Sequence, residues 1–572
     1  MKNRKKSFYF EDYIESKILE KNLYFNIVKI SFNRITFLSF VFLSLIFICS
    51  IKIIYISLSS EETFYSQNTK ENFQKGRRDI VDKNGNILAT EVNLYDAGIR
   101  PKILKNKEKK NLLIKLSLIL PDLDIKKIKK KLSKDNFFWL SRRLTPQEKD
   151  QLWLIGNKAF EFISKPSRIY PQRNLFSHIL GQTDDINSGI SGIEKSFDKD
   201  LRNINKIETP LYLTLDSNLQ YLIREELIKA QQDFQSIGSA AVLMNANNGE
   251  ILSLISLPDY DLNQRASLES ESYINKITLG VYELGSVFKT FTIAAALENN
   301  LINSNTVFNN LENNLTCDKY TISEHDKLPK KLNTEEILIR SSNIGAVRIA
   351  QKVGVKKYMN FLNSLELLNV INFDLEEIGT PLPFKWGKCK LATTSYGHGI
   401  TTTPLQLAKA YAILGNGGYK IKPSLLKKEI RSLEEKEQII SEKTSNQINS
   451  MLRKVVNLDE GTANFANIEG YEVAGKTGTA LKYNSKEKLN TFVSIFPASR
   501  PQYVLLVMLD EPQPAPNFVY EFPASEKFPN GYKYKGEKRN TSGWNTVVVA
   551  GKIIEKIGPI LAINSLQASN NF

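Results

Sequence analysis

The sequence predicts an α+β protein with one transmembrane helix near its N-terminus. Three observations support this prediction. A long uncharged apolar run occurs once, within residues 35–56. Short segments that favour antiparallel strands occur early and late in the rest of the chain, and helical stretches lie between them. Helices inserted between the strands of one antiparallel sheet are typical of α+β folds.

The N-terminal apolar run has the length and the flanking charges of a membrane anchor. Residues 35–51 carry no charge, and about 20 apolar residues span a bilayer. Eight Lys or Arg residues precede the run, whereas Glu61 and Glu62 follow it. The positive-inside tendency then places residues 1–34 in the cytoplasm and the bulk of the chain outside. A cleaved signal peptide is the competing interpretation, but only residues 57–59 resemble a cleavage site.

A polar linker over residues 57–76 and two folded domains are predicted to follow the anchor. Residues 77–205 form an α+β domain without a reactive cluster. It opens with a hairpin over residues 77–89, whose turn is Asn84-Gly85, and one of its helices begins at Thr145-Pro146.

Residues 206–572 form the second predicted domain. Strands are predicted over residues 211–216, 240–245, 251–256, 491–496 and 503–509, and helices over residues 217–232, 287–297, 334–340 and 544–557, the last ending at Gly558-Pro559.

Composition limits the classes of function. The chain has 572 residues, a net charge of +16 and 42% apolar residues. Lysine-rich runs such as residues 102–134 indicate a solvated helix face first, and a surface for an anionic membrane or wall polymer second. No aromatic RNP stretch or Cys/His finger is present, so we expect no nucleic-acid partner.

Cysteine and histidine usage argues against a metal site. His178, His325 and His398 lie near no cysteine, so neither a zinc site nor a histidine-based triad is expected, and no cofactor is expected. A disulfide between Cys317 and Cys389 is allowed in an oxidising compartment, but nothing in the sequence argues for one.

Ser286-Val287-Phe288-Lys289 is the strongest candidate for chemistry. The same Ser-x-x-Lys pattern recurs at Ser196, Ser424 and Ser485, but only here does an apolar helix follow it. A spacing of three is almost one helical turn, so the Lys289 amine can reach back toward the Ser286 hydroxyl. Burial favours the neutral amine, which can accept a proton.

Two further short segments gain meaning from their order. Ser341-Ser342-Asn343 follows a predicted helix, and Lys476-Thr477-Gly478-Thr479 lies on a predicted strand. Either segment alone is more often a helix cap or an edge strand. Together with the first tetrad, in this order, they form the signature shared by penicillin-binding proteins and class A β-lactamases.

The chain resembles the class B penicillin-binding proteins over residues 77–557. The resemblance extends beyond the three segments, although Leu284 stands where many relatives have Pro and the middle segment reads Ser-Ser-Asn. It implies a penicillin-binding, β-lactamase-like transpeptidase domain, made of an antiparallel sheet with a helical subdomain, after a non-catalytic domain. The further similar segments are residues 78–89, 168–171, 189–194, 248–252, 258–261 and 393–407.

The resemblance also implies a role for each residue of the signature. Ser286 would be the nucleophile and Lys289 its base, Ser341 would relay a proton, and Asn343 would bond the stem peptide and Lys289. Lys476, Thr477, Gly478 and Thr479 would bind the terminal carboxylate of a D-Ala-D-Ala peptide, with an oxyanion hole formed by the backbone N–H groups of Ser286 and Thr479.

The implied activity is serine-type D,D-transpeptidation of peptidoglycan at the outer face of the bacterial inner membrane. Implied partners are the stem peptides, β-lactams as covalent inhibitors, and a membrane glycan polymerase with other division proteins. The division-specific branch is favoured over the elongation branch. A β-lactamase lacks support because no Glu-x-x-Leu-Asn segment is found at the required spacing, and a penicillin sensor or a bifunctional polymerase would need a further domain.

Overall fold

The computed structural model describes residues 24–58, 76–121, 123–184, 186–264, 271–318, 320–387, 389–427, 437–522, 529–536 and 539–570. Its contacts group into two units, residues 1–74 and 75–572. Most of the predicted cytoplasmic tail and of the predicted linker lie outside the described residues.

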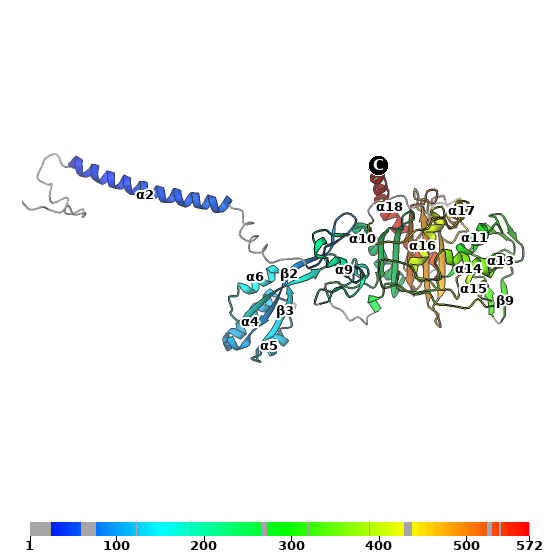
Figure 1. Cartoon of the computed structure of the whole chain (residues 1–572), viewed down its shortest axis with the longest axis horizontal. Helices are drawn as coiled ribbons and strands as arrows, with labels where there is room; N and C mark the ends of the chain where they lie inside the picture. Colours follow the sequence, from blue (N-terminus) through cyan, green and yellow to red (C-terminus); the bar gives the residue numbers. More distant parts are fainter. Residues whose placement is uncertain are drawn as a thin grey trace, which may run out of the picture. The chain divides into compact units, whose positions relative to one another are not determined.

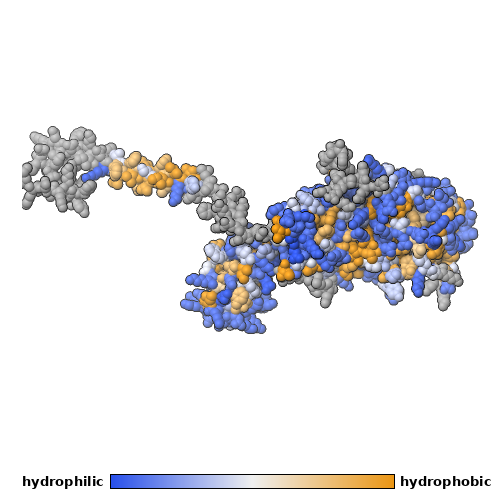
Figure 2. Space-filling model, in the orientation of Figure 1, coloured by the Kyte–Doolittle hydropathy of each residue, from blue (hydrophilic) through white to orange (hydrophobic). Residues whose placement is uncertain are grey.

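The first unit contains one long helix, α2 (Tyr24–Leu58). Its segment Arg34–Tyr55 is 22 residues long, and it is the one helix of the described residues that is long and apolar enough to cross a membrane. Apolar side chains cover most of this segment (Figure 2), and the side chains of residues 35–55 are almost all exposed. The helix is therefore consistent with the predicted membrane anchor.

A twisted sheet and three helices begin the second unit. The strand order is β3-β2-β1-β5, and β4 also pairs with β2. The predicted hairpin is confirmed, because Ile80 pairs with Ala89 across the turn that contains Gly85. The strands are β1 (Ile80–Val81), β2 (Ile87–Ile99), β3 (Phe138–Leu144), β4 (Phe160–Ile169) and β5 (Leu211–Tyr212).

The three helices pack leucine and isoleucine side chains into a separate small core. The predicted helix start at Thr145-Pro146 is confirmed: Thr145 caps the helix and forms a capping box with Glu148. The helices are α4 (Asn106–Ile119), α5 (Ile125–Leu132) and α6 (Pro146–Trp153).

The strand predicted over residues 211–216 is shorter than expected. Only Leu211–Tyr212 forms a strand, β5, and it pairs in parallel with β1. The chain therefore still belongs to the first sheet at residue 212, and the predicted domain boundary after residue 205 stays a prediction.

A five-stranded antiparallel sheet organises the rest of the second unit. Its order is β12-β13-β14-β6-β7, so strands from both ends of this region lie side by side. The predicted strands at residues 240–256 and 491–509 are confirmed. The strands are β6 (Gly238–Asn245), β7 (Ile251–Leu257), β12 (Ala474–Leu481), β13 (Lys488–Phe496) and β14 (Tyr503–Asp510).

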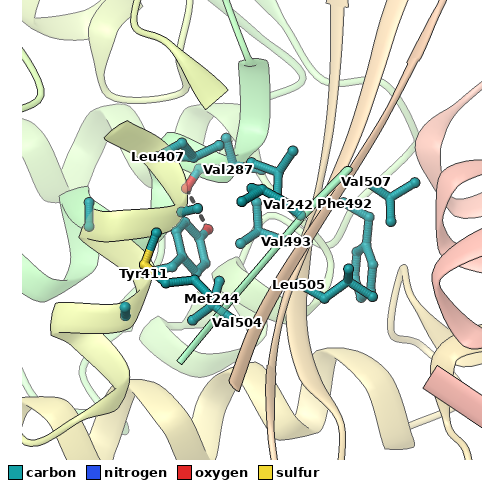
Figure 3. Close-up of a cluster of buried hydrophobic side chains, with 14 of the residues drawn as sticks. Val242, Met244, Val287, Leu407, Tyr411, Phe492, Val493, Val504, Leu505 and Val507 are labelled. Atoms are coloured by element: carbon teal, nitrogen blue, oxygen red, sulfur yellow. Dashed lines mark hydrogen bonds between the residues drawn. The ribbon is translucent and has the colours of Figure 1, made fainter. Parts of the chain in front are cut away.

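Helices cover both faces of this sheet (Figure 1). Helices α10 (Ser217–Phe234) and α18 (Thr546–Asn570) pack on one face, while α16 (Pro404–Gly415) and α17 (Glu442–Asn457) pack on the other. Neighbouring residues of a strand point to opposite faces: Val493 points toward α16, and Phe492 points away from it (Figure 3). Both strand faces are therefore buried in one continuous core.

The helical subdomain lies on the α16 side and contains most of the remaining elements. Its helices are α11 (Phe288–Glu298), α12 (Thr334–Ile339), α13 (Asn343–Val353), α14 (Val355–Ser364) and α15 (Lys390–Thr394), with β8 (Val307–Phe308), β9 (Asn314–Cys317), β10 (Tyr320–Ser323) and β11 (Leu332–Asn333). The short elements elsewhere are α7 (Ser177–Leu180), α8 (Gly192–Ser196), α9 (Asp198–Leu201), β15 (Val519–Phe522) and β16 (Tyr532–Lys535).

The predicted end of the last helix is wrong. Helix α18 continues through Pro559 to Asn570. A proline inside a helix removes one backbone hydrogen bond. Burial of Ile557 and Leu561 on either side of Pro559 holds the helix in place across this gap.

Cys317 and Cys389 form a disulfide, although nothing in the sequence argues for one. The bond joins the end of β9 to the residue that precedes α15. A small cluster of Ile322, Val347 and Ala392 connects β10, α13 and α15 near this bond. Proximity of the two cysteines thus depends on tertiary packing that their sequence spacing does not encode.

A buried ion cluster connects the start of the second unit to helices α8 and α9. The Arg77 Nε donates to Glu194 Oε2 at 2.5 Å, and both side chains are fully buried. The Arg168 Nε donates to the other Glu194 oxygen at 2.7 Å. Arg77 also donates to Asp198 at 2.7 Å. Glu194 therefore compensates two buried guanidinium groups.

We expect Glu194→Gln to lower the free energy of unfolding by about 3–5 kcal/mol, because it leaves Arg77 and Arg168 without this anion. Glu161→Gln is the matched control. The Glu161 side chain is 37% exposed in its ion pair with Arg100, and such a pair contributes about 0–1 kcal/mol. Thermal unfolding of the purified full chain measures both variants, and equal midpoints for the two would contradict the expectation.

Candidate active site

Ser286 lies on a one-turn 3-10 helix, Gly285–Val287, which leads directly into α11. Gly285 has a φ of 66°, a backbone conformation that glycine adopts without strain. The Tyr411 hydroxyl of α16 donates to the Val287 carbonyl at 2.8 Å (Figure 3). Ser286 itself is 8% exposed. The fold thus fixes Ser286 at the N-terminal end of a helix whose residues 288–297 are all buried.

Lys289 lies one turn further along, as the sequence predicts, and its side chain is fully buried. Its Nζ donates to the Ser341 carbonyl oxygen at 2.5 Å and to the Ser341 Oγ at 3.1 Å. Burial lowers the pKa of Lys289 to about 7, and the negative charge of Glu324 partly opposes this shift. Near neutral pH a substantial fraction of Lys289 is therefore the unprotonated amine.

The segment Ser341–Asn343, here called the Ser-Ser-Asn turn, joins α12 to α13. Ser341 has a φ of 57°, which is uncommon for a residue other than glycine. Ser342 caps α13 by accepting from the Gly345 N–H at 2.9 Å. The turn therefore reverses the chain sharply at Ser341 and presents its hydroxyl to Lys289.

Asn343 departs from the expected contact with Lys289. Its Nδ2 donates to the Ser323 carbonyl at 2.8 Å, and its Oδ1 is buried without a hydrogen-bond partner. The amide thus ties the turn to β10 and makes no hydrogen bond to Lys289. A buried amide oxygen that lacks a partner remains available to an N–H group of a ligand.

Lys476 approaches the same hydroxyl from the edge strand β12. It pairs with Val493 in the sheet register, which places its side chain on the α16 side. The Lys476 Nζ donates to the Ser341 Oγ at 3.0 Å, and its side chain is fully buried. Burial lowers the pKa of Lys476 well below its ordinary value, and the charge of Lys289 lowers it further.

Close packing of two backbones brings β12 against the Ser286 turn. A Cβ added at Gly478 would lie 2.2 Å from the Leu284 carbonyl oxygen, and one added at Gly285 would lie 2.7 Å from the Thr479 carbonyl oxygen. Neither position has room for a side chain. Gly478 therefore allows the strand to lie directly beside Ser286, as the sequence predicts for this glycine.

The two threonines of β12 have polar partners on neighbouring segments. The Thr477 hydroxyl lies 2.9 Å from that of Thr462, and the Thr479 hydroxyl accepts from the Ser542 N–H at 3.1 Å. Thr477 is 7% exposed, and Thr479 is half-buried. Both hydroxyl groups are thus held in place on the strand that flanks Ser286.

The structure therefore brings the predicted residues of three distant segments to one place. Sequence reasoning missed Glu324, which bonds the Ser-Ser-Asn turn, and Tyr411, which fixes the Ser286 turn. Neither residue belongs to a pattern, because Glu324 follows a short polar hairpin and Tyr411 lies in an apolar helix. Among the described residues no group of three or more potential ligands could hold a metal ion.

Comparison with known proteins agrees with this arrangement. Residues 74–211 match the family model of the penicillin-binding protein dimerisation domain, and residues 239–527 match that of the penicillin-binding protein transpeptidase domain.

Several relatives are similar over most of their length. A probable peptidoglycan D,D-transpeptidase FtsI of Caulobacter vibrioides is 30% identical over 85% of this chain and 82% of its own. The peptidoglycan D,D-transpeptidase FtsI of Buchnera aphidicola subsp. Baizongia pistaciae is 31% identical over 76% and 82%. Stage V sporulation protein D of Bacillus subtilis is 28% identical over 77% and 75%.

Among solved structures, the chain is similar to penicillin-binding protein 3 of Mycobacterium tuberculosis, solved with aztreonam. The TM-score is 0.63 at 20% identity, and the match covers 85% of this chain and 96% of that one. This similarity concerns the fold. The two family matches and the 30% identical relative show that the chain belongs to the class B penicillin-binding proteins and is a peptidoglycan D,D-transpeptidase.

Proposed function

We propose that Ser286 is the nucleophile of this transpeptidase and that Lys289 is its base. The observation that supports this most is the fully buried amine of Lys289. Its pKa is about 7, and Lys289 lies one helical turn after the serine. Ser286 Oγ attacks the carbonyl carbon of a D-Ala-D-Ala peptide bond while its proton passes to Lys289. The bond to the leaving D-Ala breaks, and an ester on Ser286 remains.

Ser341 relays the proton to the leaving amine. Its hydroxyl accepts hydrogen bonds from both Lys289 and Lys476. It therefore connects the base, Lys289, to the leaving amine. In the second half-reaction the amine of another stem peptide attacks the ester. Ser286 then recovers its proton, and the cross-link is complete.

Lys476 and the threonines of β12 bind the terminal carboxylate of the donor peptide. In the free site, burial and the charge of Lys289 lower the pKa of Lys476 well below its ordinary value. A substrate carboxylate beside Thr477 and Thr479 would raise the pKa of Lys476. Substrate binding would then charge Lys476 and keep Lys289 neutral, because two ammonium groups around one hydroxyl repel each other.

Backbone N–H groups of Ser286 and Thr479 form the oxyanion hole. The Thr479 nitrogen lies 3.2 Å from the position that a Cβ on Gly285 would occupy, so it directly adjoins the serine turn. Loss of one such donor typically costs about 10²–10³ in rate. Asn343, through its unpartnered Oδ1, accepts a hydrogen bond from the peptide backbone of the donor.

The cellular role that we propose is septal wall synthesis at the outer face of the inner membrane, with α2 as the anchor and a membrane glycan polymerase as partner. Two of the three relatives described above carry the name FtsI. β-Lactams would acylate Ser286 because they imitate the donor peptide.

We expect Ser286→Ala to abolish covalent labelling by a fluorescent penicillin while the variant keeps the thermal unfolding midpoint of the parent chain. Ser485→Ala is the control, because Ser485 starts another Ser-x-x-Lys copy in an exposed turn, and it should be labelled as the parent is. Gel fluorescence measures both. Labelling that persists in the first variant would place the nucleophile elsewhere.

The acylation rate constant should depend on pH through Lys289. Above its pKa of about 7 the amine is neutral and accepts a proton, whereas below it the ammonium cannot. We expect the rate constant to fall about tenfold per pH unit below pH 7. Quenched time courses of acylation from pH 5 to 9 give the rate constant at each pH. A rate constant that does not change from pH 6 to 8 would exclude Lys289 as the base.

Depletion of the protein in its host tests the septal role separately from the chemistry. Cells that elongate but cannot divide should form filaments, which light microscopy detects. Rounded or bulging cells would assign the enzyme to elongation and leave the proposed residue roles intact.

A further inference from the structure

Glu324, the residue after β10, accepts two hydrogen bonds from the Ser-Ser-Asn turn and one from the residue that follows the turn. Its Oε1 accepts from the Ser342 hydroxyl at 2.6 Å and from the Ile344 N–H at 3.0 Å, and its Oε2 accepts from the Asn343 N–H at 2.7 Å. These donors are the first groups of helix α13. A carboxylate in this position is stabilised both by the free N–H groups and by the helix dipole.

These contacts constrain the residues that immediately follow Ser341. Ser341 has the left-handed φ of 57° and lies immediately before the three residues that donate to Glu324. Such a conformation persists only where the surroundings impose it. Glu324 provides part of this constraint from outside the turn. Lys289 and Lys476 also donate hydrogen bonds to Ser341, and Asn343 ties the turn to the carbonyl of Ser323.

The hairpin that carries Glu324 is itself anchored. Strands β9 and β10 pair from Asn314 with Ser323 to Cys317 with Tyr320. Cys317 is bonded to Cys389 at the start of α15, and Ile322 packs on Val347 of α13. The disulfide and the Ile322–Val347 contact therefore fix the β9–β10 hairpin, and with it Glu324, to the helical subdomain.

Glu324 also contributes charge to the site. It is the anion whose field raises the pKa of Lys289 against the effect of burial. Among the described residues, the other charged or titratable groups that face Lys289 are Lys476 of β12 and His325, which follows Glu324. Both of these are cationic when protonated, so Glu324 alone among them favours the protonated form of Lys289.

We propose that Glu324 is a positioning residue of transpeptidation, which holds the Ser341 hydroxyl between Lys289 and Lys476 and supplies the negative charge beside them. This inference rests on the proposed roles of Ser286, Lys289 and Ser341. It adds a residue that lies outside the three signature segments and does not touch the reacting atoms.

Glu324→Gln is the test, with Glu312→Gln as the matched control. Glu312 precedes the same hairpin, and its side chain is 62% exposed in a pair with Lys330. The full chain is assayed for the second-order rate constant of acylation by fluorescent penicillin from pH 5 to 9, and for its thermal midpoint. We expect the plateau rate of Glu324→Gln to fall by about tenfold to a hundredfold, because Ser341 is displaced.

The same variant should move the acidic limb of the profile to lower pH. Without the carboxylate the pKa of Lys289 falls, so the amine stays neutral at lower pH. A merely structural role would reduce the amount of active protein and leave this limb in place. Glu324→Asp keeps the charge on a shorter side chain, and it should restore the limb to its parental pH while the plateau remains reduced.

A plateau and a limb equal to those of Glu312→Gln would overturn the proposal. In that case the loss of labelling in Ser286→Ala would still support Ser286 as the nucleophile. The proposal for Glu324 can therefore be wrong while the proposal for Ser286 is right. If Glu324→Gln does not fold, Glu324→Asp decides: a parental plateau in that variant overturns the positioning role.

Discussion

The site depends on one hydroxyl group that accepts hydrogen bonds from two lysine amines. Lys289 comes from the helix after the serine, Lys476 comes from the edge of the sheet, and both donate to the Oγ of Ser341. Both amines are fully buried, and two charged ammonium groups at this distance would repel strongly. At least one of them must therefore be neutral, and a neutral lysine beside a serine is what acyl transfer requires.

The rest of the domain maintains this contact. The five-stranded sheet places β12 at its edge, where the glycine at position 478 lets the strand lie against the Ser286 turn. Helix α11 is buried on all sides, and Tyr411 fixes its first turn. On the third side, the disulfide-linked hairpin holds the Ser-Ser-Asn turn through Glu324. Sheet, helix and hairpin thus each position one of the three segments.

The sequence predicted the parts of this arrangement that local patterns encode. The Ser286–Lys289 spacing, the strand around Gly478 and the Thr145 cap follow from helical periodicity, close packing and capping. The remainder depends on tertiary contacts. The partner of Cys317, the anion at Glu324 and the helix that continues through Pro559 all arise from residues distant in sequence or from burial that outweighs a local breaker. Asn343 shows the same limit, since its motif indicated a role but not its partner.

Mass spectrometry of the penicillin-labelled full chain tests the central claim most directly, because it locates the one bond that this buried cluster is arranged to form. Digestion should give a single modified peptide, with the added mass on Ser286. An adduct on any other residue, Ser341 included, would mean that the buried amines serve a different nucleophile and would contradict this account of the site.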